Sequence, residues 1–148
     1  MSILGIDYGR KKIGLAVSDE GHRLALPLEV LIGQNQSQIK ARLELICQQN
    51  QIEKIIVGVP VSMQNGSKKI FWRQVDLQNQ QMKEVLNFVN WLKKNLDLPV
   101  ELEDERLSTK LANGLRRDLV KKGPDDAVAA MLILQSHLDK MKNVKIKM

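Results

Sequence analysis

The sequence contains a single cysteine, which excludes two kinds of site. Cys47 stands alone among 148 residues, so no disulfide can form within the chain and no cluster of thiolates can hold a metal. It lies in an apolar helical pattern, and unpaired cysteines are typical of proteins in the reducing cytosol. We therefore expect a cytoplasmic protein.

Long apolar segments are also absent. No run reaches the roughly 18 apolar residues that a membrane-spanning helix needs. Asp7 interrupts the N-terminal stretch where a signal peptide would require its apolar region. The sequence predicts neither a membrane span nor secretion by the usual route.

Histidines are scarce, which narrows the possible chemistry. The two histidines, His22 and His137, lie far apart in the sequence, and each is more typical of a surface or packed residue than of a metal ligand. The sequence contains no Ser-His-Asp arrangement, no Walker-type phosphate loop and no dinucleotide fingerprint. Any metal site must therefore be built from carboxylate oxygens.

The charge is unbalanced towards the positive. Lysine and arginine number 23 against 17 aspartates and glutamates, which gives a net charge of +6. The calculated isoelectric point of about 9.5 is typical of proteins that bind nucleic acid. A polyanionic partner is therefore favoured over an acidic protein surface.

The hydrophobic pattern predicts one α/β domain over residues 1–148. Three strands come first, and Pro27 marks the third as an edge strand or a bulged one, because proline cannot donate to the ladder. Helix and strand then alternate before two final helices. The predicted strands are 2–8, 13–19, 23–31, 54–60 and 100–105, and the predicted helices are 37–50, 82–96, 108–122 and 127 to about 141.

One segment, 61–76, is too long for a simple connection. Loops of this length in a compact domain are usually functional or mobile. It carries cations together with aromatic residues, a combination that suits phosphate contact and base stacking. The alternative is a surface loop whose aromatic side chains pack onto the core. The residues concerned are Lys68, Lys69, Phe71, Trp72 and Arg73.

Acidic residues occur at three places that could form one site. Asp7 lies within an otherwise apolar strand, where a carboxylate is costly to bury without a partner. A second group, at 101–105, ends a predicted strand, and a third, Asp125 and Asp126, begins the last helix. Hard oxygen ligands without histidine or cysteine favour Mg²⁺ or Mn²⁺ over zinc.

Several segments, in order along nearly the whole chain, resemble the YqgF/RuvX family of pre-16S rRNA nucleases, also called Holliday-junction-resolvase-like proteins. They are GIDYGRKKIGLAVSD (5–19), ALPLEVL (25–31), IIVGVPVSM (55–63), DERLST (104–109) and DAVAAMLILQSHLD (126–139). The resemblance implies a ribonuclease H-like fold, with a mixed five-stranded sheet and helices on both faces. The segment 63–81 departs from the family pattern, so the resemblance does not fix the substrate.

The resemblance also implies an acidic triad of Asp7, Glu105 and Asp126, which would act as catalytic residues and metal ligands. Asp104 is the alternative to Glu105, and Asp125 is an additional neighbour. We expect two Mg²⁺ or Mn²⁺ ions in a two-metal hydrolysis of phosphodiester bonds. The expected role is processing of the 5′ end of precursor 16S ribosomal RNA during ribosome biogenesis, with resolution of branched DNA as the alternative.

Basic side chains could hold the phosphate backbone of structured nucleic acid. The candidates are Arg10, Lys11, Lys12, Lys68, Lys69, Trp72, Arg73, Arg106, Lys110, Arg117 and Lys121. A module that binds nucleic acid or the ribosome without cleaving it would share these residues. Three convergent carboxylates would then serve no purpose, because without metal they repel phosphate. We expect a monomer or a homodimer.

A kinase-like function is a further alternative. The GIDYG segment and its basic turn resemble the first phosphate-binding hairpin of actin-like ATPases and sugar kinases. Those proteins enclose a nucleotide between two such domains, and this chain has the length of one.

Overall fold

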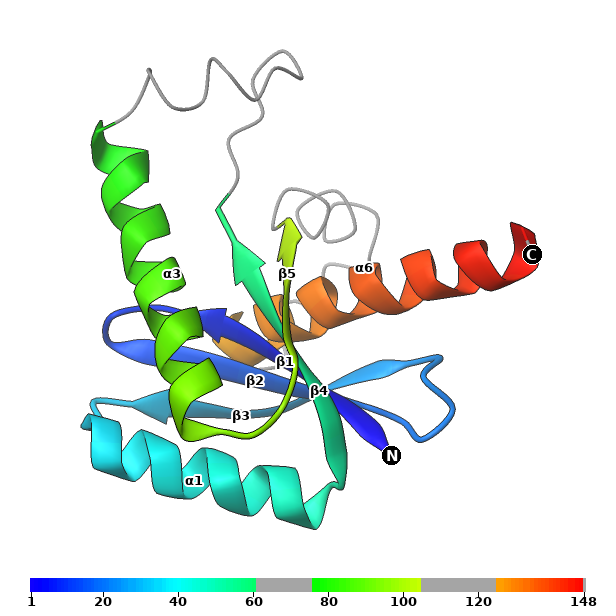
Figure 1. Ribbon diagram of the computed structural model, residues 1–148, viewed down its shortest axis with the longest axis horizontal. Helices are drawn as coiled ribbons and strands as arrows, with labels where there is room; N and C mark the ends of the chain where they lie inside the picture. The colour runs from blue at the N-terminus through cyan, green and yellow to red at the C-terminus, as the bar shows by residue number, and fades with distance from the viewer. Residues whose placement is uncertain (61–75, 105–124, 148) are drawn as a thin grey trace.

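The computed structural model describes the backbone of residues 1–60, 76–104 and 125–147 (Figure 1). Statements about the structure concern these residues. The predicted helix 108–122 and the segment 61–75 lie outside them. The described elements are β1 (Ser2–Tyr8), β2 (Lys12–Ser18), β3 (Ala25–Ile32), α1 (Gln36–Gln49), β4 (Ile52–Val59), α3 (Asp76–Asn95), β5 (Val100–Asp104) and α6 (Asp125–Lys147).

The five strands form one mixed sheet in the order β3-β2-β1-β4-β5. β1 pairs antiparallel with β2 and parallel with β4, and β5 extends the parallel half. The parallel pairs need crossovers, and α1 and α3 lie in the connections that lead to β4 and β5. The prediction of a mixed five-stranded sheet with helices is confirmed.

Pro27 lies where its missing N–H is tolerated. β3 is an edge strand of the sheet. The pairing with β2 also shifts at this point: Ala16 faces Pro27, whereas Leu15 faces Glu29, so β3 has one extra residue there. Both features expected from the proline are present, because an edge and a bulge each leave a residue without a ladder hydrogen bond.

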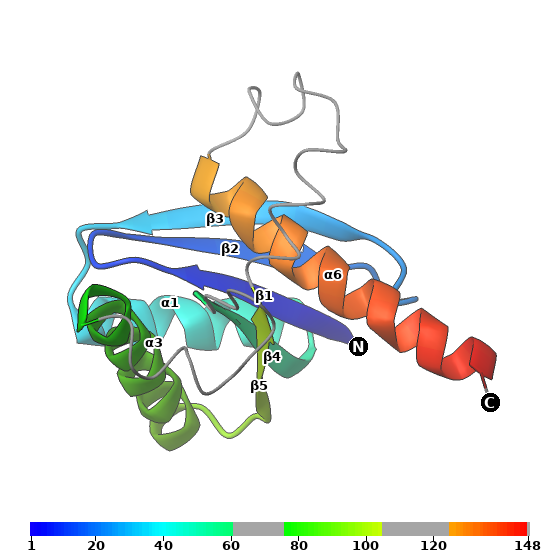
Figure 2. The ribbon, with the colours of Figure 1, turned by 90° about the horizontal axis from the view of Figure 1, so that it is seen from above.

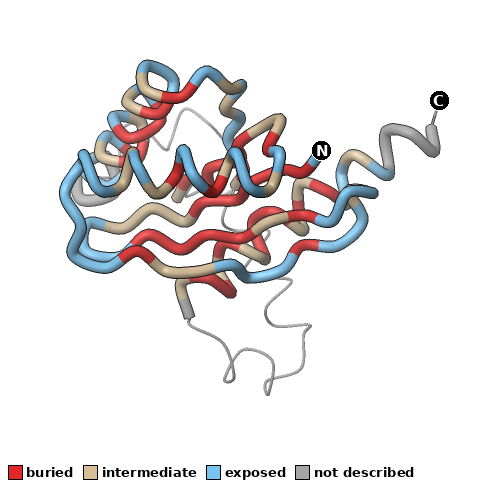
Figure 3. Tube along the Cα trace, turned by 90° about the horizontal axis from the view of Figure 1, so that it is seen from below, coloured by how far each residue is buried: buried red, intermediate tan, exposed pale blue. Residues whose placement is uncertain are grey.

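The helices cover the sheet on both faces. Seen from above, α1 and α3 lie on one face and α6 crosses the other (Figure 2). Alternate residues of β1 divide between the two sides: Leu4 and Ile6 join the core under α1 and α3, and Ile3 joins the core under α6. Burial is therefore densest along the central strands (Figure 3).

Helix α6 packs unusually close to the sheet, because small residues lie beneath it. A Cβ placed on Gly5 would be 2.8 Å from the Cβ of Leu134, and Ala16, which pairs with Gly5, is fully buried on the same face. The helix continues to Lys147, beyond the predicted end near Met141. No glycine or proline follows Met141, and the lysines there are good helix formers.

The single cysteine, Cys47, is partly buried in α1. Partial burial raises the pKa of the Cys47 thiol to about 11, so the thiol stays protonated at neutral pH. Among the residues described, no helix combines the length and apolar character needed to cross a membrane.

Candidate active site

Asp7 lies near the end of β1, on the face of the sheet that α6 covers. It pairs directly with Gly14 of β2, and residues opposite each other in an antiparallel pair point to the same face. The Asp7 side chain is half-buried. A carboxylate thus stands next to the apolar core, at the end of a parallel strand, where ligand sites of α/β sheets form.

Gly14 brings the start of α6 against this position. A Cβ on Gly14 would lie 1.9 Å from the carbonyl oxygen of Asp126 and 3.0 Å from the nitrogen of Ala127. The helix backbone therefore occupies the space where any other residue would place its side chain. Asp126 is half-buried. The backbone of Asp126 thus lies against the residue that pairs with Asp7, although the two acids are 119 positions apart in the sequence.

The third predicted acid, Glu105, lies outside the described residues, as does the side chain of Asp125. Asp104 is described, and it pairs with Val59, which belongs to the core under α3. Asp104 therefore belongs to the opposite face of the sheet from Asp7. Within the described ranges no group of three histidine, cysteine or acidic side chains could hold a metal ion, and the triad cannot be completed without Glu105.

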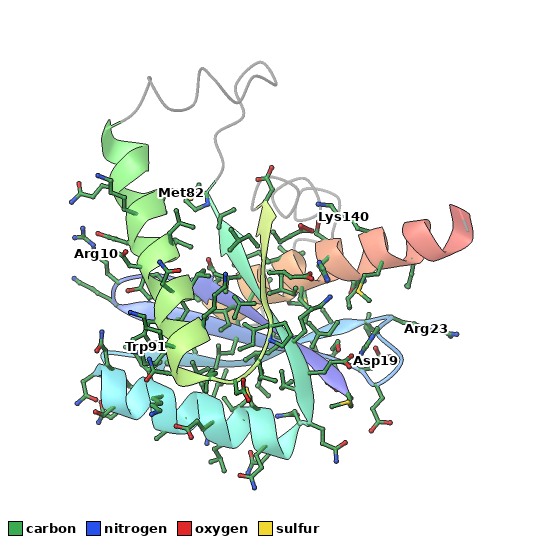
Figure 4. The ribbon with its side chains drawn as sticks, viewed as in Figure 1. Arg10, Asp19, Arg23, Met82, Trp91 and Lys140 are labelled. Atoms are coloured by element: carbon green, nitrogen blue, oxygen red, sulfur yellow. The ribbon has the colours of Figure 1, made fainter. Side chains whose placement is uncertain are left out.

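Charged side chains link α6 to β5 on the site face. The Lys140 ammonium donates to a carboxylate oxygen of Glu103 at 3.0 Å, and Glu103 is 5% exposed (Figure 4). The other carboxylate oxygen of Glu103 is buried without a hydrogen bond among the residues described. Sequence reasoning grouped Glu103 with the acids of β5, but Lys140 gave no signal of contact with it.

The turn between β1 and β2 carries the predicted basic residues. Arg10, Lys11 and Lys12 are exposed, and the turn is closed by a hydrogen bond from Gly9 N to Lys12 O of 2.9 Å. Arg10 reaches α3, where Glu84 accepts from its Nε at 2.8 Å and from its Nη2 (Figure 4). This ion pair lowers the pKa of Glu84 and raises that of Arg10.

The other predicted substrate-binding residues lie outside the described part of the chain. They are Lys68, Lys69, Trp72, Arg73, Arg106, Lys110, Arg117 and Lys121.

Sequence reasoning missed a row of aromatic side chains at the end of β1, on the α3 face of the sheet. Tyr8 stacks on Phe88 with ring centroids 4.3 Å apart, and Phe88 stacks on Trp91 at 5.8 Å. Tyr8 follows Asp7 and so points to the opposite face of the sheet, towards α3. The three-residue spacing of Phe88 and Trp91 on one helix was the available signal, but the contact with Tyr8 was not readable from it.

His137 makes stability depend on pH. Burial, and secondarily Lys54, lower its pKa, although Glu101 and Glu103 oppose the shift and Lys140 adds to it. As pH falls through the ordinary histidine pKa of about 6.5, the unfolded chain therefore takes up a proton before the folded chain does. The free energy of unfolding should therefore fall as pH drops through this value.

The His137→Gln variant isolates this effect. Urea denaturation of parent and variant between pH 5 and pH 8 should show a shallower loss of stability in the variant. Identical slopes for the two proteins would contradict the assignment to His137.

With this geometry in view, comparison with known proteins identifies the family. The model of the family described as "RuvX: Holliday junction resolvase" matches residues 1–140. This chain belongs to the RuvX family. The family assignment inferred from the GIDYG, DERLST and DAVAA segments is confirmed, and it places the protein among nucleases, which hydrolyse phosphodiester bonds.

Curated relatives agree with the family match. A protein of Rickettsia typhi named "Putative pre-16S rRNA nuclease" is 36% identical, with 97% of this chain and 88% of the relative covered. A protein of Rickettsia conorii with the same name is 34% identical and covers 96% of this chain.

Solved structures support the fold. Thermus thermophilus RuvC in complex with a Holliday junction substrate superposes with a TM-score of 0.64 at 19% identity, with 96% of both chains covered. A second RuvC structure gives a TM-score of 0.58. The RuvX protein therefore has the ribonuclease H-like α/β fold expected from its sequence.

Proposed function

We propose that this RuvX protein is a metal-dependent nuclease whose site is formed by Asp7, Asp126 and Glu105. The observation that carries the proposal is the contact at Gly14, where the backbone of Asp126 takes the place of a side chain opposite Asp7. A structural helix could pack on any small residue. Here the helix contacts Gly14, the residue that pairs with the half-buried Asp7, and this position favours a functional site over simple packing.

Strand alternation argues against Asp104 as the third ligand. Glu103 pairs with Gly58, two residues before the proposed ligand, and its side chain meets Lys140 of α6. Neighbouring residues of a strand point to opposite faces, so Glu103 belongs to the α6 face and Asp104 to the other. The proposal therefore assigns the role to Glu105 and leaves Asp104 outside the site.

The available donors fit Mg²⁺ or Mn²⁺, because Asp7 and Asp126 supply hard carboxylate oxygens. Asp7, Asp126 and Glu105 would hold the ions, two in number by this proposal. When bound, such ions supply an activated water and stabilise the leaving oxygen. The N-terminal end of α6 adds a favourable field for the carboxylate of Asp126.

The chain's own cations would orient the substrate. Arg10, Lys11 and Lys12 project from the turn that begins two residues after Asp7, so phosphates bound there lie close to the acids. By this proposal, the predicted basic residues outside the described part would add further phosphate contacts. We expect the protein to act in the cytoplasm as a monomer or a homodimer.

The proposed substrate is precursor 16S ribosomal RNA, cut near its 5′ end. The curated relatives, at about a third identity over nearly the full chain, carry this substrate in their names. Branched DNA is the second candidate, because the family description names Holliday junctions.

A cleavage assay tests both substrates. Purified protein is incubated with end-labelled precursor rRNA or with a four-way DNA junction, in Mg²⁺, Mn²⁺ or chelator. We expect metal-dependent cuts in the RNA and none with chelator. Tight binding without cleavage of either substrate in any metal would refute the nuclease function and favour a binding module.

Because Arg10 and Glu84 form an ion pair, we expect substitutions of the two residues to change the affinity for nucleic acid in opposite directions. Arg10→Ala should weaken binding to nucleic acid. The plot of the log of the association constant against log salt should also become less steep by about 0.7–0.9, the value for one lost phosphate contact. Glu84→Gln releases Arg10 and removes a negative charge, so it should tighten binding about threefold to tenfold.

The control for Glu84→Gln is Glu20→Gln, which removes an exposed acid from the turn between β2 and β3 at the other end of β2. Binding is measured by fluorescence anisotropy over a salt series with chelator present. Equal tightening in both acid variants would show that only net charge matters, and not the position beside Arg10.

A further inference from the structure

A groove runs along α3 beside the β1–β2 turn, on the opposite face of the sheet from Asp7. It consists of two adjoining pockets, of about 210 Å³ and about 300 Å³, which share Tyr8 and Glu84 as walls. The smaller contains Phe88 and Trp91, and the larger contains Arg10. The pair between Arg10 and Glu84 therefore stands between an aromatic pocket and a basic one.

The aromatic pocket has the composition of a base-binding site. Three of the chain's five aromatic residues gather there, with Phe88 buried between half-buried Tyr8 and Trp91. Tyr8 and Trp91 pack against the core with part of each ring, and the exposed part is available to stack on a base. The pocket is smaller than the roughly 300–1,000 Å³ typical of sites for drug-sized ligands, so it suits one flat ring system.

Polar groups surround these rings. Gln36 and Asn87 line the same pocket, and the side-chain amide of each offers a donor and an acceptor that could meet the edge of a base. Trp91 lies on α3 on the side towards α1 (Figure 4), so the pocket lies between these two helices and the end of β1. Rings with amides at the rim differ from a purely apolar docking surface.

The groove and the proposed active site lie on opposite faces of the sheet and adjoin only at the end of β1. Tyr8 follows Asp7, and consecutive Cα atoms lie about 3.8 Å apart, so the two side chains leave the same point of β1 towards opposite faces. A strand that crosses the end of β1 can place a phosphate at Asp7 and a neighbouring base in the groove. A stacked duplex cannot, because its bases are held together.

We propose that this groove binds one unstacked nucleotide of the substrate strand, with the base against Tyr8 and Trp91 and its phosphate at Arg10. The inference rests on the proposed nuclease function and specifies a single-stranded nucleotide next to the cut. Arg10 exchanges Glu84 for the phosphate. The exchange costs little because the Arg10 side chain is 68% exposed, and exposed ion pairs are weak.

Tryptophan fluorescence tests the proposal without substitution of any described residue that lines the groove. The chain has two tryptophans, so Trp72→Phe leaves Trp91 as the only one. In the metal-free protein, a single-stranded RNA of mixed sequence should quench Trp91, and a blunt duplex of the same sequence should not. Unchanged Trp91 fluorescence at saturating single strand would overturn the proposal.

Substitution of Trp91 gives a second, quantitative test. Trp91→Leu keeps an apolar side chain but removes the stacking surface, and it should weaken single-strand binding by about 5- to 150-fold, the range for one stacked base. Trp91→Phe should bind nearly as the parent does. Melting temperatures confirm that both variants are folded.

The results of these tests distinguish the nucleotide-binding groove from the proposed nuclease function. Parent-like affinity of a folded Trp91→Leu variant, with cleavage retained, would refute the groove and leave the nuclease intact. Failure of the parent chain to bind any nucleic acid would refute both.

Discussion

Asp7→Asn should reduce cleavage by on the order of a thousandfold or more while nucleic acid still binds. The amide keeps the shape of the side chain, so the pairing with Gly14 should survive, but the negative charge that holds divalent cations is lost. Binding rests on the basic turn and should stay equal or improve in chelator, because one anion near the phosphate is gone.

The measurements are single-turnover cleavage, anisotropy in chelator, and calorimetric titration of the protein with Mn²⁺. The matched control is Asp97→Asn, an exposed acid in the loop before β5, at the opposite end of the parallel strands. It should cleave as the parent does. Parent-like cleavage by pure, folded Asp7→Asn would exclude Asp7 as a metal ligand.

Gly14→Ala should damage both stability and cleavage, although it changes no charged or polar side chain. The new Cβ would fall 1.9 Å from the Asp126 carbonyl oxygen, which belongs to a helix backbone and cannot rotate away. Overpacking of this kind costs about 1–3 kcal/mol and occasionally more. Because the helix start must move, Asp126 leaves its place beside Asp7, and the metal affinity should fall with it.

Gly21→Ala is the control for this substitution. The nearest atom to a Cβ on Gly21 is a side-chain oxygen of Asp19 at 3.7 Å, an ordinary contact. Urea denaturation and Mn²⁺ titration are compared for both variants. A folded Gly14→Ala protein with parent-like metal binding and cleavage would show that α6 need not touch this point of the sheet.

Much of the fold could be predicted because its signals are local. Short apolar runs bounded by turn residues predicted the five strands, and Pro27 predicted an edge or a bulge from its missing N–H alone. The end of α6 was placed too early, since no glycine or proline near Met141 stops the helix. Helix ends depend on signals of one or two residues, and here none existed.

The groove beside α3 was not predictable from the sequence. Tyr8 and Phe88 lie 80 residues apart, and Arg10 and Glu84 lie 74 apart. Each residue by itself has an ordinary local explanation, such as a strand aromatic or a surface charge. Only the position of α3 against the end of β1 brings them together.

The sequence by itself determined which residues are chemically exceptional. An acid in an apolar strand, acids at a strand end and a helix start, and the absence of cysteine and histidine clusters indicate oxygen ligands for a hard cation. The tertiary structure decided which of them share a face. Strand alternation turns Asp7 towards α6 and Asp104 away from it, and the missing side chain of Gly14 admits the helix start that carries Asp126. These relations depend on pairing register and on the distance between layers, which are set by contacts between residues far apart in the chain.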